Sequence, residues 1–153
     1  MRYGLCHAGF VPCRSFRPSQ CPEWLRDGVI YQVYPSSHKD SDGNGIGDIR
    51  GVISELDYIE SLGVRAIWFN PLFVSGWIDG GYDVIDFYRV DPRFGTNNDM
   101  VELIEKAHAK GIKVMLDLVA GHTSDKHPWF IQSSQDTNLQ YSDYYIWSDR
   151  LPD

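Results

Sequence analysis

Short apolar runs alternate with amphipathic segments along the middle of the chain, and this alternation predicts strands and helices in turn. Runs rich in β-branched and aromatic residues at 29–34, 64–69 and 112–116 predict buried strands. Between these runs, apolar residues recur at spacings of three and four over 49–62 and 100–107, which predicts one amphipathic helix in each interval. The order strand, helix, strand, helix, strand predicts a parallel sheet covered by helices.

Residue types at the ends of the helical segments support this interpretation. Gly63 and Gly111 each stand directly after a segment, where a residue in the left-handed region commonly ends a helix. Thr96 and Asp99 have the spacing of a capping box, with Asp in place of the usual Glu. Gly63 and Gly111 are therefore expected to end the helices of two successive strand–helix units in the same way.

Two regions show no such pattern. Residues 71–95 have no clear period, and the residues from His122 onward do not continue the strand–helix alternation. Three such units cannot close an eight-stranded barrel, which typically needs about 250 residues. The pattern alone leaves two architectures open, namely a small open sheet and the front part of a longer barrel.

Composition excludes several classes of function. The chain has 153 residues, enough for one domain, with 14 basic against 21 acidic residues and a formal net charge of −7. With no basic patch, nucleic-acid binding is not expected. No apolar run approaches the roughly 18 residues that a membrane span needs, so no membrane partner is expected either.

The first 22 residues predict an irregular leader. All three cysteines of the chain lie in this region, and their number and spacing indicate neither a disulfide framework nor a zinc site. The apolar stretch of the leader is too broken for a good signal peptide. We therefore expect a cytoplasmic protein, with secretion as the alternative.

Polar side chains gather directly after each predicted strand, which is where parallel α/β folds bind ligands. The groups that follow the three strands are His38, Asp40, Asp42, Asn44 and Asp48; Asn70, Asp79, Tyr82 and Asp83; and Asp117, His122 and Asp125. A binding site at this edge of the sheet is one interpretation. The other is that loops are simply polar.

The loop at 40–48 has the strongest local signal for a ligand. Its oxygen-bearing side chains occupy alternating positions around glycines, which suits a hard cation such as calcium. It is not an EF-hand, because the twelfth position from Asp40 is Gly51 rather than the bidentate Glu. Two interpretations remain: a calcium loop of another kind, or an Asx-turn loop whose carboxylates cap the following helix.

Several ordered motifs resemble those at the start of the α-amylase family, glycoside hydrolase family 13, and of its exo-acting branch of α-glucosidases, oligo-1,6-glucosidases and trehalose synthases. The motifs are Val29–Pro35, Asp40–Asp48, Gly81–Tyr88, Val90–Thr96, Asp117–His122, His122–Phe130 and Tyr144–Trp147. The resemblance implies an α/β fold, namely the first three βα units of a (β/α)8 TIM barrel and the start of a domain inserted after strand three. It divides the chain into a leader (1–22), a partial barrel (23–121) and the start of the inserted domain (122–153).

The resemblance also implies roles for individual residues. Tyr82 is similar to the tyrosine that stacks under the sugar, and Asp83 to the acid that binds the terminal sugar's hydroxyls. His122 is similar to the histidine that contacts the 6-hydroxyl, and Asp117 to the aspartate that orients other groups near the site. The calcium ligands that it implies are Asp40, Asp42, Asn44, the carbonyl of Ile46, and Asp48. Gly121 stands where the family has an Asn ligand of a second calcium, so that second site is not expected.

The family's catalytic carboxylates follow strands four, five and seven, and those segments are not among the 153 residues. We therefore predict no catalytic residue; a catalytic pair made of Asp83 and Asp117 is an alternative without support from the family. The function implied is that of the amino-terminal part of a retaining, α-glucosidase-like enzyme of carbohydrate metabolism. Its ligand would be an α-linked glucose oligosaccharide, and its cofactor calcium. A non-catalytic calcium- or sugar-binding fragment and a truncated gene product remain alternatives.

Overall fold

The computed structural model describes residues 22–135 and 140–148. Its elements, in chain order, are α1 (Glu23–Arg26), β1 (Ile30–Val33), α2 (Pro35–His38), α3 (Ile49–Ser54), α4 (Leu56–Ser61), β2 (Ala66–Phe69), β3 (Phe73–Ser75), β4 (Val84–Val90), α5 (Asn97–Ala109), β5 (Lys113–Leu116), α6 (Pro128–Gln135) and the short 3-10 helix η2 (Ser142–Tyr144). The three predicted strands correspond to β1, β2 and β5. Their order in the chain, separated by helices, agrees with the prediction.

The three predicted strands form one parallel sheet in the order β1-β2-β5. The register sets Ile30 beside Ala66 and Ala66 beside Lys113. Because side chains alternate between the two faces of a strand, this register places Gln32, Trp68 and Met115 on one face together. The predicted parallel arrangement is confirmed.

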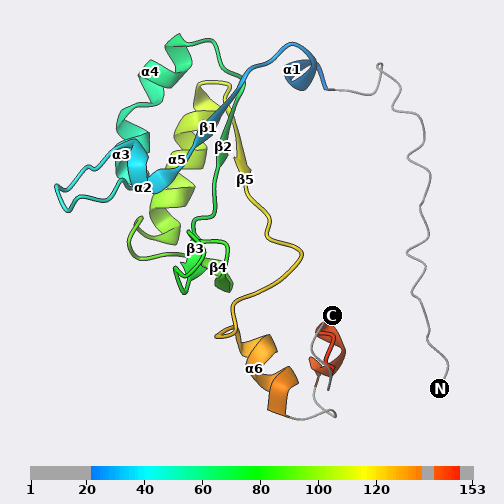
Figure 1. The fold of residues 1–153 in the computed structure, drawn as a ribbon. Helices are drawn as coiled ribbons and strands as arrows, with labels where there is room; N and C mark the ends of the chain where they lie inside the picture. The colour runs from blue at the N-terminus through cyan, green and yellow to red at the C-terminus, as the bar shows by residue number, and fades with distance from the viewer. Residues whose placement is uncertain (1–21, 136–139, 149–153) are drawn as a thin grey trace.

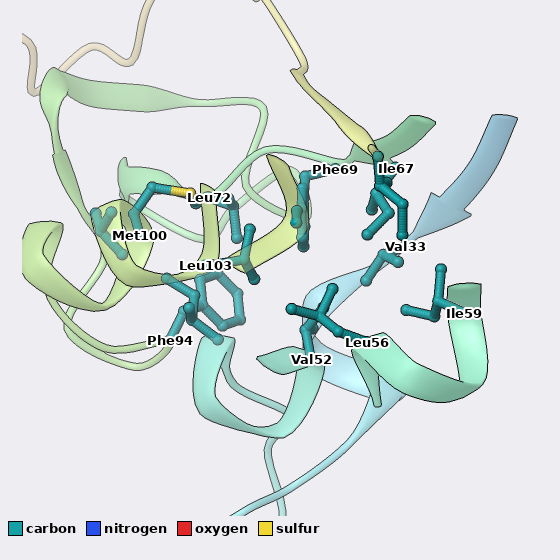
Figure 2. Close-up of a cluster of buried hydrophobic side chains, with 14 of the residues drawn as sticks. Val33, Val52, Leu56, Ile59, Ile67, Phe69, Leu72, Phe94, Met100 and Leu103 are labelled. Atoms are coloured by element: carbon teal, nitrogen blue, oxygen red, sulfur yellow. The ribbon is translucent and has the colours of Figure 1, made fainter. Parts of the chain in front are cut away.

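Among the described residues, helices cover one face of this sheet. Figure 1 shows α3, α4 and α5 on the same side of the three strands. Ile67 and Phe69 of β2 are fully buried against them, and each such side chain contributes roughly 1.5–3 kcal/mol to folding. Figure 2 labels some of the members of this core: Val33, Val52, Leu56, Ile59, Ile67, Phe69, Leu72, Phe94, Met100 and Leu103.

The opposite face of the sheet is much more accessible. Ile30 and Met115 are each 37% exposed, and Trp68 is only half-buried. In a closed barrel this face points inward and is filled by side chains of the other strands. The helix-covered face therefore corresponds to the outside of a barrel's sheet, and the accessible face corresponds to its interior.

The interval 49–62 contains two helices instead of the one that the sequence predicts. The helical hydrogen bonding is interrupted at Glu55, which separates α3 from α4. The hydroxyl of Ser54 donates to the Gly51 carbonyl at 2.7 Å, a side-chain bond that competes with the helical ladder. Gly51 is required because a Cβ there would overlap the Lys39 carbonyl. The capping box at Thr96 and Asp99 and the positive φ of Gly63 and Gly111 are as predicted.

The structure contains a β-hairpin where the sequence predicts no element. Strands β3 and β4 pair antiparallel, with Phe73 beside Val90 and Ser75 beside Val84. The register shifts on both sides of Val74, so the side chains do not alternate regularly. That irregularity explains why 71–95 shows no period in the sequence.

Beyond β5 the chain leaves the sheet. The amide of Ser124 donates to the carbonyl of Val84 at 2.9 Å, so the segment passes beside the start of β4 before α6 begins. Figure 1 shows α6 and η2 apart from the three-stranded sheet. The predicted domain boundary at residue 121 stays a prediction.

Of the predicted leader (1–22), residues 1–21 lie outside the described residues, as do 136–139 and 149–153 of the predicted inserted domain. In the described part, no helix combines the length and the apolar character needed to cross a membrane.

Candidate functional site

Four side chains near the carboxyl ends of the parallel strands form a continuous chain of hydrogen bonds. Gln32 Nε2 of β1 donates to Asn70 Oδ1 at 2.9 Å, and Asn70 Nδ2 donates to the Tyr82 hydroxyl at 3.1 Å. The Tyr82 hydroxyl in turn donates to Asp117 Oδ2 at 2.9 Å. Asn70 directly follows β2 and Asp117 directly follows β5, so the chain of bonds spans all three strands and fixes the Tyr82 ring.

Tyr82 and Asp117, two of the predicted site residues, are therefore in direct contact. The hydrogen bond to Asp117, together with burial, raises the pKa of Tyr82 above its usual value. The phenol consequently stays neutral at physiological pH, with its proton directed at the carboxylate. Tyr82 is half-buried, and a neutral aromatic ring has an apolar face against which the apolar face of a ligand can pack.

Tyr82 reaches this position because the β3–β4 connection turns tightly. Gly80 and Gly81 have φ values of 59° and 103°, a region that residues with a Cβ rarely adopt. The Tyr34 hydroxyl donates to the Gly80 carbonyl at 3.3 Å, and the Tyr82 amide donates to the Asp79 carbonyl at 2.9 Å. The two glycines thus let the loop curl over the carboxyl end of the sheet.

Asp83 is buried, and its carboxylate accepts hydrogen bonds inside this loop. Ser75 Oγ donates to Oδ1 at 2.7 Å, and the amides of Ile78 and Asp79 donate at 3.2 Å each. Burial acts to raise the pKa of Asp83, but these three hydrogen bonds outweigh it, so the pKa lies below its usual value. Asp83 is therefore an ionised, oriented acceptor at neutral pH.

His122 lies apart from the other three predicted site residues. It is exposed and forms no hydrogen bond within the described residues. It lines a cavity of about 590 Å³, together with residues of the segment after β5, of β4, of α6 and near η2. Half of this lining consists of Phe, Tyr and Trp side chains, namely Phe87, Tyr88, Trp129, Phe130, Tyr144 and Tyr145. The structure thus joins Tyr82 to Asp117 by a hydrogen bond, and Asp83 is the next residue after Tyr82. His122 has no hydrogen bond to any of the three.

The loop at 40–48 folds around its own carboxylates. Asp40 accepts hydrogen bonds from the amides of Asp42 (3.1 Å), Gly43 (2.7 Å) and Gly45 (2.7 Å). Asp48 accepts from Ser41 and caps α3 through the Gly51 amide at 2.7 Å. The helix-capping interpretation of the sequence is therefore correct for Asp48.

The same loop brings several carboxylates together. One oxygen from each of Asp40, Asp42 and Asp48 lies within 4.8 Å of the other two. The backbone hydrogen bond from Gly45 is the main cause that lowers the pKa of Asp40. Burial acts to raise the pKa of Asp48, but hydrogen bonds from Ser41 and Gly51 lower it overall. Both groups stay ionised at neutral pH, although they repel one another.

This geometry fits one calcium ion. Two oxygens bound to the same calcium at roughly 2.3–2.6 Å can lie at most about 5 Å apart, and the three carboxylate oxygens meet that limit. The Ile46 carbonyl accepts no hydrogen bond within the described residues, and Asn44 Oδ1 accepts one, from the Ile46 amide at 2.8 Å. Both oxygens therefore retain lone pairs for a cation.

The environment of His38, which precedes this loop, should make the stability of the fold depend on pH. The His38 Nε2 is buried and has no hydrogen-bond partner among the described residues. Burial lowers the pKa of His38, while nearby Glu55 opposes and Lys39 adds to the effect. Because the pKa is lower in the folded state than in the unfolded state, stability is lost as pH falls below about 6.5, where the unfolded chain takes up the proton first.

We expect the melting temperature to fall as pH falls from 7.5 to 5.0, and to fall by a few degrees less in His38→Phe. The exposed His108 of α5 provides a control, since His108→Gln should change the slope little. Burial also lowers the pKa of His127, which should account for the pH dependence that remains. Thermal melts across this range test the prediction, and identical slopes in the wild type and His38→Phe would contradict it.

Sequence reasoning assigned no individual role to several residues that shape the site, and it named Asn70 only among the polar residues after the second predicted strand. Gln32 and Asn70 orient Tyr82, and Ser75 orients Asp83. The only signal for Gln32 is an amide inside an otherwise β-branched and aromatic strand. Trp77 and Asp91 hold the loop in place through the hydrogen bond from the indole N–H to Asp91 Oδ2 at 2.8 Å. The sequence contains no signal for that contact, because it depends on the hairpin.

Known proteins resemble this chain closely. Residues 32–152 match the family model described as "Alpha amylase, catalytic domain". The oligo-1,6-glucosidase of Heyndrickxia coagulans is 47% identical over 131 residues, which cover 86% of this chain and 24% of that protein. The trehalose-6-phosphate hydrolase of Escherichia coli K12 is 46% identical over 132 residues, again 86% and 24%.

Solved structures agree with these relatives. The trehalose-6-phosphate hydrolase of Bacillus licheniformis superposes with a TM-score of 0.82 at 47% identity, over 86% of this chain and 24% of that one. The isomaltulose synthase of Klebsiella sp. LX3 superposes with a TM-score of 0.80 at 45% identity, over 85% and 23%. The chain spans about a quarter of the length of these relatives. Its parallel sheet and helices correspond to the amino-terminal part of a TIM barrel, and the chain belongs to the α-amylase catalytic-domain family.

Proposed function

We propose that this chain is the amino-terminal part of an α-glucosidase-like enzyme and that it supplies part of the binding site for a terminal α-linked glucose. Tyr82 stacks under the sugar ring, and the ionised Asp83 accepts hydrogen bonds from the hydroxyls. The observation that carries the proposal is the hydrogen-bonded chain that holds Tyr82 against Asp117 at the carboxyl ends of the parallel strands. The names of the relatives, among them oligo-1,6-glucosidase and glucan 1,6-alpha-glucosidase, support α-glucosides as the ligand class.

His122 is the third residue that we assign to the proposed sugar site, from the segment that follows β5. It is exposed and lines the aromatic cavity, so its ring nitrogens are free to bond to a hydroxyl group. Aromatic side chains in the same cavity favour a ligand with apolar faces and polar edges. Asp117 acts differently, because it holds the Tyr82 hydroxyl and so orients the ring.

We also propose that the loop at 40–48 binds one calcium ion through Asp40, Asp42, Asn44, the Ile46 carbonyl and Asp48. When bound, the ion would neutralise three carboxylates that otherwise repel one another. Asp48 also caps α3. Residues of α3 belong to the core on the helix-covered face of the sheet that carries the proposed sugar site. The ion would therefore act on stability, and no step of sugar binding depends on direct contact with it.

Calorimetric titration with isomaltose and maltose tests the proposed sugar site. We expect roughly millimolar dissociation constants and no measurable binding of the β-linked cellobiose. Asp83→Asn should weaken binding by roughly tenfold or more, because it removes the charge from the acceptor of the sugar's hydroxyl groups. Asp79→Asn is the matched control, since Asp79 is an exposed carboxylate of the same loop whose side chain forms no hydrogen bond to any described residue.

The rival proposal is a fragment that binds calcium and no sugar. It has its own support in the cluster of carboxylates at 40–48. Calcium uptake without any isomaltose signal would favour it. Equal isomaltose affinity in Asp83→Asn and the wild type would remove Asp83 from the proposed site.

A further inference from the structure

Trp77 has an unusual backbone conformation. Its φ is 58°, and within the described residues it is the single non-glycine residue with a positive φ. A bulky residue adopts this region at an energetic cost, and such strain persists only where the surroundings hold it in place. Trp77 lies in the same short loop as Tyr82 and Asp83, the two residues that we propose contact the sugar.

Contacts on several sides hold the Trp77 indole in place. Its N–H donates to Asp91 Oδ2 at 2.8 Å, and Asp91 is buried. The Arg93 guanidinium lies over the ring at 3.7 Å from its centroid, and the ring of Phe94 meets it edge-on at 5.4 Å. A Cβ at Gly81 would meet the indole at 3.4 Å, so the loop closes around the ring.

These contacts continue as hydrogen bonds to Asp83. The Trp77 amide donates to Ser75 Oγ at 3.1 Å, which occupies a lone pair of that hydroxyl. The Ser75 hydroxyl then donates its own proton to Asp83 Oδ1 at 2.7 Å. Asp91 Oδ2 also accepts from the Ser75 amide at 3.4 Å. The buried carboxylate of Asp91 thereby holds both Ser75 and Trp77 in place.

The conformation of Trp77 also aims the next two amides. The Ile78 and Asp79 amides both donate to Asp83, at 3.2 Å each. These donors follow Trp77 directly, so their direction depends on its strained φ. A Trp77 in the ordinary right-handed or extended region would turn them elsewhere.

We propose that Trp77 is a positioning residue, whose indole bond to Asp91 holds a strained backbone so that Ser75 and the next two amides orient the Asp83 carboxylate. The inference rests on the proposed function, because it gives Trp77 a part in sugar binding only through Asp83. Trp77 need not touch the sugar. Its role is to hold the loop conformation through the packed and hydrogen-bonded indole.

The test replaces the indole while keeping an aromatic ring. Trp77→Phe retains much of the packing and removes the donor to Asp91; Asp91→Asn retains the size of the acceptor and removes its charge. Trp24→Phe is the control, because Trp24 lies in α1, away from the loop. For each variant of the 153-residue chain, carbon-13 NMR gives the pKa of the Asp83 carboxyl, calorimetry gives the isomaltose affinity, and a thermal melt gives stability.

We expect the measured pKa of Asp83 to rise by roughly half a unit to one unit in Trp77→Phe, as its donors become disordered. Isomaltose affinity should fall roughly threefold to tenfold, the usual worth of one hydrogen bond. Asp91→Asn should shift both in the same direction, and Trp24→Phe neither.

Three outcomes separate the possibilities. A lower melting temperature with an unchanged Asp83 pKa in both Trp77→Phe and Asp91→Asn would overturn the inference, since Trp77 would then only stabilise the fold. A raised Asp83 pKa together with weaker sugar binding supports it. A raised Asp83 pKa in a chain whose wild type binds no isomaltose would overturn the proposed function and support the orienting role of Trp77.

Discussion

Calcium is expected to raise the melting temperature of this chain, and the variant Asp42→Ala/Asp48→Ala is expected to lose the effect completely. A ligand at 100 times its dissociation constant stabilises the folded state by about 2.7 kcal/mol. For a chain of this size that corresponds to a rise of roughly 5–10 °C. Calorimetry of calcium uptake, beside thermal melts with and without the ion, provides the measurement.

The single variants separate binding from folding. Asp48 caps α3, so Asp48→Ala lowers stability even without calcium. Asp42 is exposed, and in the described part of the chain its carboxylate accepts hydrogen bonds only from Asn44. Asp42→Ala should therefore weaken calcium binding with little effect on the calcium-free protein. Asp79→Ala, which removes an exposed carboxylate outside the loop, is the control. Unchanged calcium uptake in the double variant would show that the loop is not the site.

The second large effect concerns turnover: the purified 153-residue chain should release no glucose from maltose or isomaltose above background. Tyr82, Asp83 and His122 bind and orient a sugar, and ground-state binding by itself does not lower a barrier. Retaining hydrolysis needs a nucleophilic carboxylate with an acid/base carboxyl group about 5–5.5 Å away. Hydrogen bonds from its own loop hold Asp83, and the Tyr82 hydroxyl holds Asp117, an arrangement that orients both carboxylates as acceptors for binding; the family resemblance gives neither of them a catalytic role.

A coupled glucose-release assay checks this expectation, with Asp83→Ala/His122→Ala as the control for contaminating enzymes. Turnover in the wild-type chain that disappears in the double variant would assign a catalytic role to these residues. Turnover that persists equally in the double variant would come from a contaminant.

The sequence predicted the parallel sheet correctly because its signal is local. The strands around Tyr31 and Ile67 are β-branched and aromatic, and Gly63 and Gly111 end the preceding helical segments with positive φ. Family motifs then supplied what periodicity could not, namely that three strand–helix units belong to a larger barrel.

Other features depend on contacts between distant residues, and the sequence did not predict them. The β3–β4 hairpin was missed because its register shifts beside Val74 remove the alternation of side chains. The break at Glu55 was missed because the apolar spacing of three and four continues across it. The site was predicted as a set of residues, but the bonds that orient Tyr82 join residues 12 and 35 positions apart.

The most direct test of the proposed site is a nitrogen-15 NMR titration of the chain with isomaltose, with cellobiose as the control. We predict shifts concentrated at the amides of Gly81, Tyr82 and Asp83 and at the segment around His122, saturating at millimolar isomaltose and absent with cellobiose. Shifts at other positions only, or equal shifts with both sugars, would contradict the proposal that this chain carries part of an α-glucoside site.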